Sequence, residues 1–370
     1  MASRRLGLVT NPTGITADFR TAAEVIGSLG HSQLTALFAC EHGINGQHQA
    51  GVKFADEIDA SLGIPVYSLY GQHKKPTADM LDNVDTVIFD IQDLGVRFYT
   101  YISTLLYVME ACAEQGKSLL VLDRPAPLGG AGCEGGLLQE GYESMVGAWS
   151  MPIRTGMTLG ELALMINDRK GLGCDLAVIP MGGWSREMEF TDTGLPWMLP
   201  SPNVPGIDTV RVYSGTCFLE GTNLSEGRGT TRPFEWIGAP WVDGARLAEA
   251  MAKHRLPGVH FHPVYATPAF SKHQGELCGG VRLFVTAPQA YQSVRTGLAL
   301  LHTVQALYPE QFQWLAPPRP GGRYFIDLLT GGEEVRRRID TIEGMHEITA
   351  QWQEESRLWL SLRRSYLLYS

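Results

Sequence analysis

The chain has 370 residues, 44% of them hydrophobic and 19% charged, a composition that is ordinary for a globular protein long enough to form two domains. Thirty basic residues against 39 acidic ones give a net charge of −9, which argues against a surface that binds nucleic acid. No stretch approaches the roughly 20 apolar residues of a membrane span, and the start lacks a secretory signal, so the sequence as written is expected to be cytoplasmic, or secreted or periplasmic if a leader was removed.

The first half of the chain alternates short apolar runs with segments of helical periodicity. Predicted strands lie at residues 6–10, 34–39, 66–69, 86–91, 118–123 and 176–180. Their continuous apolar character is typical of strands buried on both faces. One helix is predicted at residues 100–116, and Thr158 with Glu161 forms a capping box that opens another. This alternation predicts an α/β fold with a parallel, doubly wound sheet.

The pattern changes in the proline- and glycine-rich residues 199–234. We place the domain boundary inside this connection, which divides the chain into residues 1–210 and 211–370. The predicted elements beyond it are a helix at 243–254, strands at 260–265 and 280–286, a helix at 291–307 and a final helix at 346–369. The second half is therefore expected to be a smaller α+β domain.

Ligands of an open parallel sheet bind beyond the carboxyl ends of its strands. This rule selects four loops, at residues 11–16, 41–48, 92–99 and 124–128. None carries a G-x-G-x-x-G dinucleotide fingerprint, a P-loop or the G-x-S-x-G elbow of a serine hydrolase. The chemistry must therefore come from other polar side chains in these loops.

The stretch CEHGINGQH, residues 40–48, gathers a thiol, a carboxylate and two imidazoles. A metal site is one interpretation, with His73, Asp90 and Asp93 completing the shell. The spacing of His42 and His48 does not fit the His-x-x-x-His pattern of zinc helices, and the six cysteines are scattered without a Cys-x-x-Cys pair. A second interpretation is a polar loop that only satisfies backbone groups at a strand end.

The third interpretation is an acid catalyst. A glutamate that emerges from a buried strand end is partly desolvated, which favours the protonated form needed for proton donation. The segment FDIQDLGVRFYTY, residues 89–101, offers further candidates: Arg97 either pairs with a carboxylate of the protein or binds a substrate carboxylate. Glu220, Asn223, Glu226 and Arg228, in residues 220–234, are expected either to close a cleft between the domains or to form a polar turn.

The residues quoted above belong to a larger set of motifs, which includes VTNPTG, EHGINGQHQAG, FDIQDLGVRFYTYISTL, DRPAPLGG, MPIRTGMTLGELA, SPNVP, GTCFLEGTNLSEGRGTTRPFEWIGAPW and PAFSKHQGELCGGV. In this order and spacing they resemble the exo-β-N-acetylmuramidase family of peptidoglycan hydrolases, from about residue 6 to the C-terminus. The resemblance implies a Rossmann-like catalytic domain, an auxiliary C-terminal domain and release of terminal N-acetylmuramic acid from peptidoglycan fragments, without a metal or other cofactor.

The resemblance also implies roles for particular residues. Glu41 becomes the candidate catalytic acid, and His42 orients it or contacts the sugar. Asp93, Arg97 and Tyr99 are candidates for positioning or for the second catalytic role, which the sequence does not assign. The expected substrate-binding residues are Asn11, Arg97, Asn223, Glu226 and Arg228. The sequence departs from the family pattern at Cys40, where proline is usual, and at Thr155, where histidine is common.

Two alternatives to a glycosidase remain open at this point. One is a metal-dependent hydrolase built on His42, His48, His73 and nearby aspartates. The other is a sugar-binding protein that kept the fold and lost its catalytic activity. The expected partner is a glycan, in the form of muropeptides or peptidoglycan ends, rather than a nucleic acid or a membrane.

Overall fold

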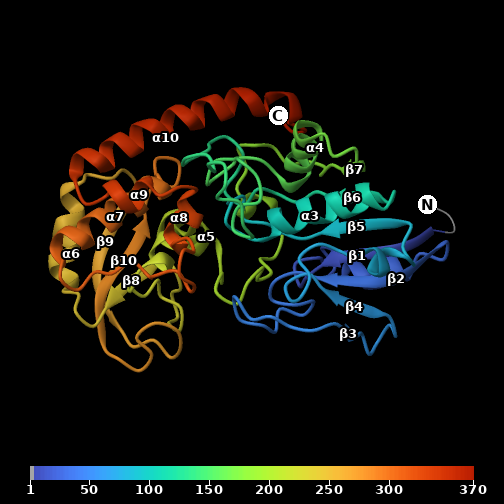
Figure 1. The fold of residues 1–370 in the computed structure, drawn as a ribbon, viewed down its shortest axis with the longest axis horizontal. Coiled ribbons are helices and arrows are strands. Elements are labelled where there is room, and N and C mark those ends of the chain that lie inside the picture. The colour runs from blue at the N-terminus through green and yellow to red at the C-terminus, as the bar shows by residue number, and fades with distance from the viewer. Residues whose placement is uncertain (1–3) are drawn as a thin grey trace.

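The computed structural model describes residues 4–370, within which seven strands form one sheet in the order β3-β4-β2-β1-β5-β6-β7 (Figure 1). The strands are β1 (Arg4–Thr10), β2 (Ser32–Ala39), β3 (Glu57–Ile58), β4 (Pro65–Ser68), β5 (Thr86–Asp90), β6 (Ser118–Leu122) and β7 (Asp175–Ile179). All neighbours pair in parallel except the short edge strand β3, which is antiparallel to β4. The predicted parallel, doubly wound sheet is confirmed.

Two apolar cores lie on the two faces of this sheet because successive strand residues point to opposite sides. The helices of this half are α1 (Ala22–Gly27), α2 (Ala78–Leu81), α3 (Tyr101–Glu114), α4 (Leu159–Lys170) and the 3-10 turn η1 (Phe190–Thr193). Helix α1 covers one face, where Ile26 packs with Leu8 and Leu37. Helices α3 and α4 cover the other, where Leu105 and Leu162 belong to a core shared with β5.

Helix α4 begins where the capping box predicts it. The Thr158 Oγ1 atom accepts from the Glu161 backbone N–H at 3.3 Å, and the Glu161 carboxylate accepts from the Thr158 N–H at 3.1 Å. The helix ends at Gly171, whose left-handed conformation (φ 61) closes it without the steric cost that a Cβ would bring. The fully buried Glu161 carboxylate also forms an ion pair with Arg186.

The second half forms a smaller α+β unit around a three-stranded antiparallel sheet in the order β8-β10-β9. Its strands are β8 (Trp236–Ala239), β9 (Val259–Ala266) and β10 (Cys278–Val285). Its helices are α5 (Ile207–Thr216), the 3-10 turn η2 (Cys217–Gly221), α6 (Gly244–Lys253), α7 (Ser293–Leu307), α8 (Phe325–Thr330), α9 (Glu334–Arg338), α10 (Ile342–Leu362) and η3 (Arg363–Tyr366). The connection at 199–234 is more ordered than the sequence indicates, because α5 and η2 lie within it.

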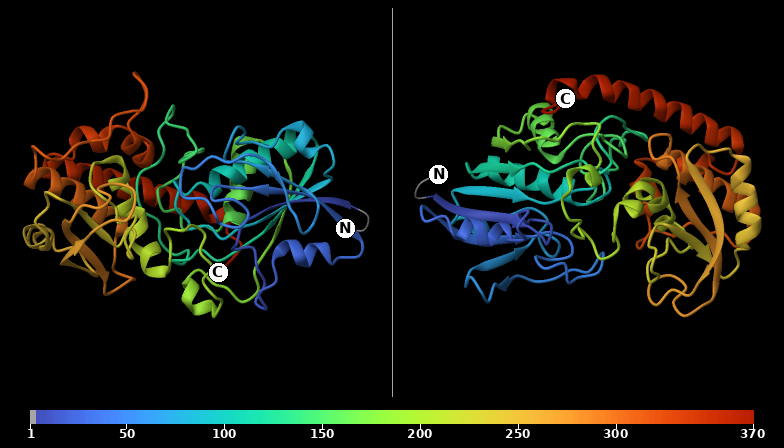
Figure 2. Two further views of the ribbon diagram at one scale, coloured as in Figure 1. Left: turned by 90° about the horizontal axis from the view of Figure 1, so that it is seen from below. Right: turned by 180° about the vertical axis from the view of Figure 1, so that it is seen from behind.

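Helix α10 runs along both halves of the molecule and brings the C-terminus back to α4 (Figures 1 and 2). The Trp359 indole N–H donates to the Thr155 carbonyl at 2.9 Å, and the Ser356 hydroxyl donates to the Gly135 carbonyl at 3.2 Å. The Leu368 N–H donates to the Glu161 carboxylate at 2.8 Å. One continuous core therefore joins the two sheets, with Trp352 and Trp359 as members contributed by α10.

Two further expectations concern the whole chain. The six cysteines are free, and all but Cys133 are buried, as expected for thiols that pack as small apolar residues. Among residues 4–370, no helix combines the length and the apolar character needed to cross a bilayer.

Candidate active site

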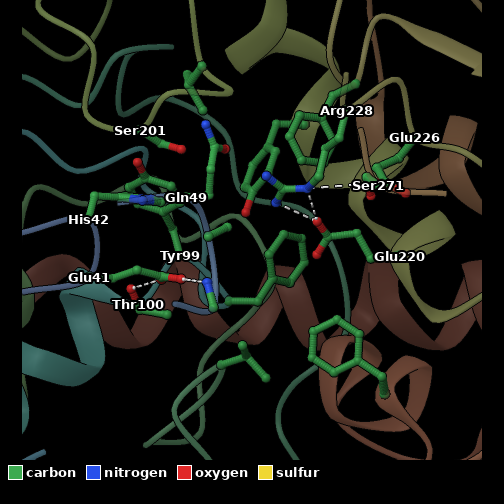
Figure 3. Close-up of a pocket in the computed structure, with 18 of the residues that line it drawn as sticks. Glu41, His42, Gln49, Tyr99, Thr100, Ser201, Glu220, Glu226, Arg228 and Ser271 are labelled. Atoms are coloured by element: carbon green, nitrogen blue, oxygen red, sulfur yellow. Dashed lines mark hydrogen bonds and ion pairs between the residues drawn. The ribbon is translucent and has the colours of Figure 1, made fainter. Parts of the chain in front are cut away.

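A cavity of about 540 Å³ lies between the carboxyl ends of the parallel strands and the second half of the chain (Figure 3). This volume is within the usual range for a small-ligand site. Its wall includes ionisable side chains, hydroxyls and aromatic rings from both halves. The lining residues are Glu41, His42, Gln49, Ala50, Gly51, Tyr70, Phe98, Tyr99, Thr100, Val146, Ser201, Val204, Tyr213, Glu220, Glu226, Arg228, Phe234, Phe270, Ser271, Lys272 and Phe325.

Glu41 follows the buried end of β2, and both of its carboxylate oxygens are held in place. Oε1 accepts from the Gly51 backbone N–H at 2.9 Å, and Oε2 accepts from the Thr100 hydroxyl at 2.8 Å. Burial, assisted by the negative charge of Glu41, raises the pKa of the Tyr70 phenol, which therefore stays protonated. The geometry presents one half-buried carboxyl group to the cavity in a fixed orientation.

His42 has a backbone φ of 76°, a left-handed conformation that is strained for a residue with a Cβ. Its ring Nδ1 lies 2.8 Å from the His48 carbonyl. A carbonyl only accepts, so Nδ1 carries the proton. Burial lowers the pKa of His42 despite the neighbouring Glu41 carboxylate. The ring is therefore neutral near pH 7, and its Nε2 is a hydrogen-bond acceptor.

Across the cavity, Arg228 joins two carboxylates contributed by the connection (Figure 3). Its Nη2 lies 2.6 Å from Glu220 Oε1, and its Nε lies 3.3 Å from Glu226 Oε1. Lys272 Nζ lies 3.0 Å from Glu226 Oε2. Burial lowers the pKa of Arg228, but the two carboxylates outweigh it and hold the pKa above its usual value. Arg228 Nη1 is buried and has no hydrogen-bond partner among the described residues.

Aromatic rings line the deep part of the cavity. Tyr99 packs edge-on against Tyr213, which in turn packs edge-on against Phe234. Burial raises the pKa of the Tyr99 phenol far above its ordinary value, and nearby acidic groups add to the effect. Tyr99 therefore stays protonated, and its hydroxyl is a buried hydrogen-bond donor that has no partner among the described residues.

The structure brings together five of the nine predicted site residues. Glu41, His42, Tyr99, Glu226 and Arg228 line the cavity. The other four, Asn11, Asp93, Arg97 and Asn223, do not line it.

Arg97 is not placed to bind a substrate carboxylate, which corrects the expectation. Its side chain is 0% exposed, because the loop after β5 turns back and bridges to Arg154 through Val96. Nη1 donates to the carbonyls of Gly136 and Met151, both at 2.7 Å, and Nη2 donates to the Leu329 carbonyl at 2.9 Å. Arg97 therefore ties distant backbone segments together.

The two asparagines also have backbone partners outside the cavity. Asn11 Oδ1 accepts from the Thr13 N–H at 2.9 Å, which closes the turn after β1 and places Asn11 beside a separate cavity. Asn223 donates to the Gln311 carbonyl at 2.8 Å and accepts from the Gln313 N–H at 3.0 Å. Both side chains stabilise loops and do not line the cavity described above, so their expected contact with substrate stays a prediction.

Asp93 is buried and does not line the cavity. Oδ1 accepts from the Gly95 N–H at 2.6 Å, while Oδ2 has no partner in the part of the chain that the structure describes. Burial raises the pKa of the Asp93 carboxyl to about 8, and hydrogen bonds from the Gly95 and Leu94 backbone offset this only in part. The carboxyl is therefore mostly protonated at pH 7, which suits a structural role rather than that of a catalytic base.

This burial predicts a pH-dependent stability. Between about pH 4 and pH 8 the folded state holds a proton on Asp93 that the unfolded state releases, so the free energy of unfolding falls as the pH rises through this window. Asp93→Asn imitates the protonated carboxyl. The free energy of unfolding of Asp93→Asn minus that of the wild type should therefore increase by roughly 1 kcal/mol for each pH unit as the pH rises across the window. Urea denaturation at pH 5 and pH 7 measures the difference, with Asp340→Asn as the exposed control; parallel pH profiles for Asp93→Asn and wild type would contradict the assignment.

Several residues that line the cavity are not among those expected from the sequence. Tyr70 follows β4 and Thr100 precedes α3, at the same edge of the sheet as Glu41. Phe270, Ser271 and Lys272 belong to the PAFSKHQGELCGGV motif, and Lys272 reaches the wall of the site through contacts with residues 219–226. The strand-exit rule extended to β4 would have found Tyr70. No local pattern in the sequence predicts that Phe270, Ser271 and Lys272 line the cavity.

The structure does not bring together the donor atoms that the metal-site interpretation requires in the described residues. Within residues 4–370 no three His, Cys, Asp or Glu side chains come close enough to hold a metal ion. The His42 Nδ1 atom is engaged by the His48 carbonyl, and the His48 ring stacks on Phe54. These histidines therefore shape the loop around Glu41.

Comparison with known proteins adds a further observation. Residues 6–208 match the family described as exo-β-N-acetylmuramidase NamZ, N-terminal, and residues 211–369 match its C-terminal counterpart. The peptidoglycan β-N-acetylmuramidase NamZ of Bacillus subtilis (strain 168) is 44% identical over 369 residues, which are 100% of this chain and 88% of that protein.

Two crystal structures, both of DUF1343 family proteins from Bacteroides fragilis, have the same fold. The first is 35% identical with a TM-score of 0.92, and the comparison covers 100% of this chain and 95% of that one. The second is 29% identical with a TM-score of 0.76, covering 99% of this chain and 94% of that one. The similarity therefore extends over both halves of the molecule and includes the elements that form the cavity.

Proposed function

Since this chain belongs to the exo-β-N-acetylmuramidase NamZ family, we propose that it hydrolyses the glycosidic bond of terminal N-acetylmuramic acid in peptidoglycan fragments, with Glu41 as the catalytic acid. The observation that carries the assignment of Glu41 is its carboxyl group, held by Gly51 and Thr100 at the wall of the interdomain cavity. The family and the B. subtilis relative support the reaction class and the sugar.

The proposed role of Glu41 is to protonate the glycosidic oxygen as the bond to C1 of the sugar breaks. Glycosidases use a carboxylic acid in this position because the leaving oxygen must gain a proton. The Thr100 hydroxyl both donates and accepts, so its hydrogen bond to Oε2 survives the change between the charged and neutral forms of Glu41. His42, neutral and with Nε2 as an acceptor, is proposed to receive a hydrogen bond from the sugar.

The lactyl carboxylate distinguishes N-acetylmuramic acid from N-acetylglucosamine, and we propose that it binds beside Arg228. Arg228 Nη1 is a buried donor with no partner among residues 4–370, so an anionic oxygen at this position would satisfy it. Lys272 adds a second positive charge nearby through its contact with Glu226. Glu220 and Glu226 hold the Arg228 guanidinium in a fixed orientation from the opposite side.

Three chromogenic substrates test this function in one experiment. They are the 4-nitrophenyl β-glycosides of N-acetylmuramic acid, of its lactyl methyl ester and of N-acetylglucosamine. We expect kcat/KM for the free acid to exceed that for N-acetylglucosaminide by roughly 100-fold, because the glucosaminide leaves the buried Arg228 Nη1 donor without a partner. The ester should lose most of this advantage. Equal rates for the muramide and the glucosaminide would refute the proposed specificity.

The alternative of an inactive sugar-binding protein is tested by the same assay. Such a protein would bind the muramide without releasing nitrophenol, and replacing Glu41 would not alter that result. No feature of the cavity favours this alternative, because the Glu41 carboxyl is positioned by two hydrogen bonds and faces the cavity.

A further inference from the structure

The loop at residues 267–277 joins β9 to β10 and brings the second half of the chain to the cavity. Lys272 anchors it, since Nζ donates to the carbonyls of Leu219 and Leu224, both at 2.9 Å, and contacts Glu226 Oε2 at 3.0 Å. These partners belong to the segment that also carries Arg228. The loop is therefore fixed to the wall of the site by partly buried polar contacts.

The backbone on both sides of Lys272 is strained. Ser271 (φ 70) and His273 (φ 56) adopt the left-handed conformation that costs free energy for any residue with a Cβ. Such strain persists where the surroundings determine the conformation, and it is common at ligand-binding loops. Here His273 Nε2 is bound to the Asn223 carbonyl at 2.7 Å, and the Gly229 carbonyl accepts from the Ala269 N–H at 2.8 Å.

Gly229 shows how closely the loop approaches the connection. A Cβ at this position would lie 2.4 Å from the Phe270 carbonyl oxygen, and φ is +80° there. Only glycine permits this contact, which holds the Phe270 backbone in place. The neighbouring Ser271 lies in the same region as Arg228 and Glu226 (Figure 3).

This rigid loop presents an exposed aromatic ring at the rim of the cavity. Phe270 lines the cavity and is 40% exposed, whereas Phe98, Tyr99 and Phe234 in the same wall are 3%, 6% and 1% exposed. A single exposed ring is common on a protein surface, but Phe270 lies on the wall of the cavity, where a bound ligand would remove its apolar surface from water. The buried rings therefore form the deep wall, and Phe270 marks the open side.

We propose that Phe270 is the stacking platform of a second sugar subsite, which binds the leaving-group sugar of the substrate. The inference rests on the proposed function. An enzyme that removes a terminal sugar holds that sugar at the closed end of its pocket, so the leaving group points to the open side, where Phe270 lies. The flat, apolar C–H face of a pyranose packs on an aromatic ring, and the ligand class is therefore a neutral pyranose such as N-acetylglucosamine.

Two substrates that share the terminal sugar and differ in the leaving group test this subsite. One is the disaccharide of N-acetylmuramic acid and N-acetylglucosamine, and the other is β-N-acetylmuramyl fluoride, in which fluorine replaces the second sugar. Phe270→Ala should lower kcat/KM for the disaccharide by roughly five- to tenfold and leave the value for the fluoride within about twofold. Phe270→Tyr should retain the wild-type ratio because it keeps the ring.

Tyr265→Ala is the matched control, since Tyr265 is an aromatic residue on the adjacent strand that is 70% exposed and does not line the cavity. It should leave both substrates unaffected. If Phe270→Ala lowers kcat/KM equally for the disaccharide and the fluoride, or for neither, the proposed subsite is refuted. If the wild-type protein releases N-acetylmuramic acid from neither substrate, the proposed function itself fails and the subsite fails with it.

Discussion

Glu41→Gln should lower the rate of N-acetylmuramic acid release by roughly 10²- to 10⁴-fold, the contribution typical of a positioned acid. Glutamine has the shape of glutamate and still accepts hydrogen bonds through its side-chain carbonyl. Its amide, however, does not protonate a glycosidic oxygen. The contacts with Gly51 and Thr100 need only a modest adjustment, so the fold should be retained. Steady-state kinetics with the muramide substrate measures the rate, and a thermal melt of each protein shows whether the fold is retained.

Glu249→Gln is a suitable control because Glu249 is exposed on α6 and pairs only with Lys253. It should match the wild type in rate and melting temperature. Wild-type turnover by Glu41→Gln would remove Glu41 from the catalytic role. A loss of activity accompanied by a large fall in melting temperature would show a structural role instead.

Arg97→Met should lower the free energy of unfolding by about 3–5 kcal/mol, because it leaves three buried carbonyls without their donor. These carbonyls belong to segments from both halves of the chain, so the loss should also weaken their association. Urea denaturation monitored by tryptophan fluorescence measures the change. Since Arg97 does not line the cavity, KM for the muramide should stay within about twofold of wild type under conditions where the variant is folded.

Arg357→Met provides the comparison, since the Arg357 side chain is 75% exposed and the change should alter stability by less than about 0.5 kcal/mol. A wild-type free energy of unfolding in Arg97→Met, combined with a much higher KM, would return Arg97 to a role in substrate binding. Comparing the stability and the KM of these two variants therefore distinguishes a structural role of Arg97 from a role in substrate binding.

The sequence predicts the parts of this molecule that depend on local patterns. Continuous apolar runs mark the parallel strands, and Thr158 with Glu161 marks the start of α4. The strand-exit rule selects the loop of Glu41 because the carboxyl ends of β2 and its parallel neighbours meet at one edge of the sheet. These inferences need no knowledge of distant contacts.

The parts that the sequence does not predict depend on contacts between distant residues. Arg97 looks like a loop residue because it is a charged residue that follows the end of a strand, but one of its partners, Leu329, is 232 positions away. Phe270 and Lys272 reach the cavity only because the β9–β10 hairpin packs beside the connection at 219–229. A single sequence contains no signal for such long-range packing.

The return of the C-terminus to the first half has a consequence for how the protein is made. Glu161 and Arg186 lie in the first half, yet Glu161 accepts from the Leu368 N–H and the Arg186 N–H donates to the carbonyl of Ser370. A growing chain folds from its N-terminus as it leaves the ribosome. The N-terminal sheet therefore emerges with Glu161 and Arg186 able to pair with each other, and the contacts from residues 368–370 are added only once that later segment has been synthesised.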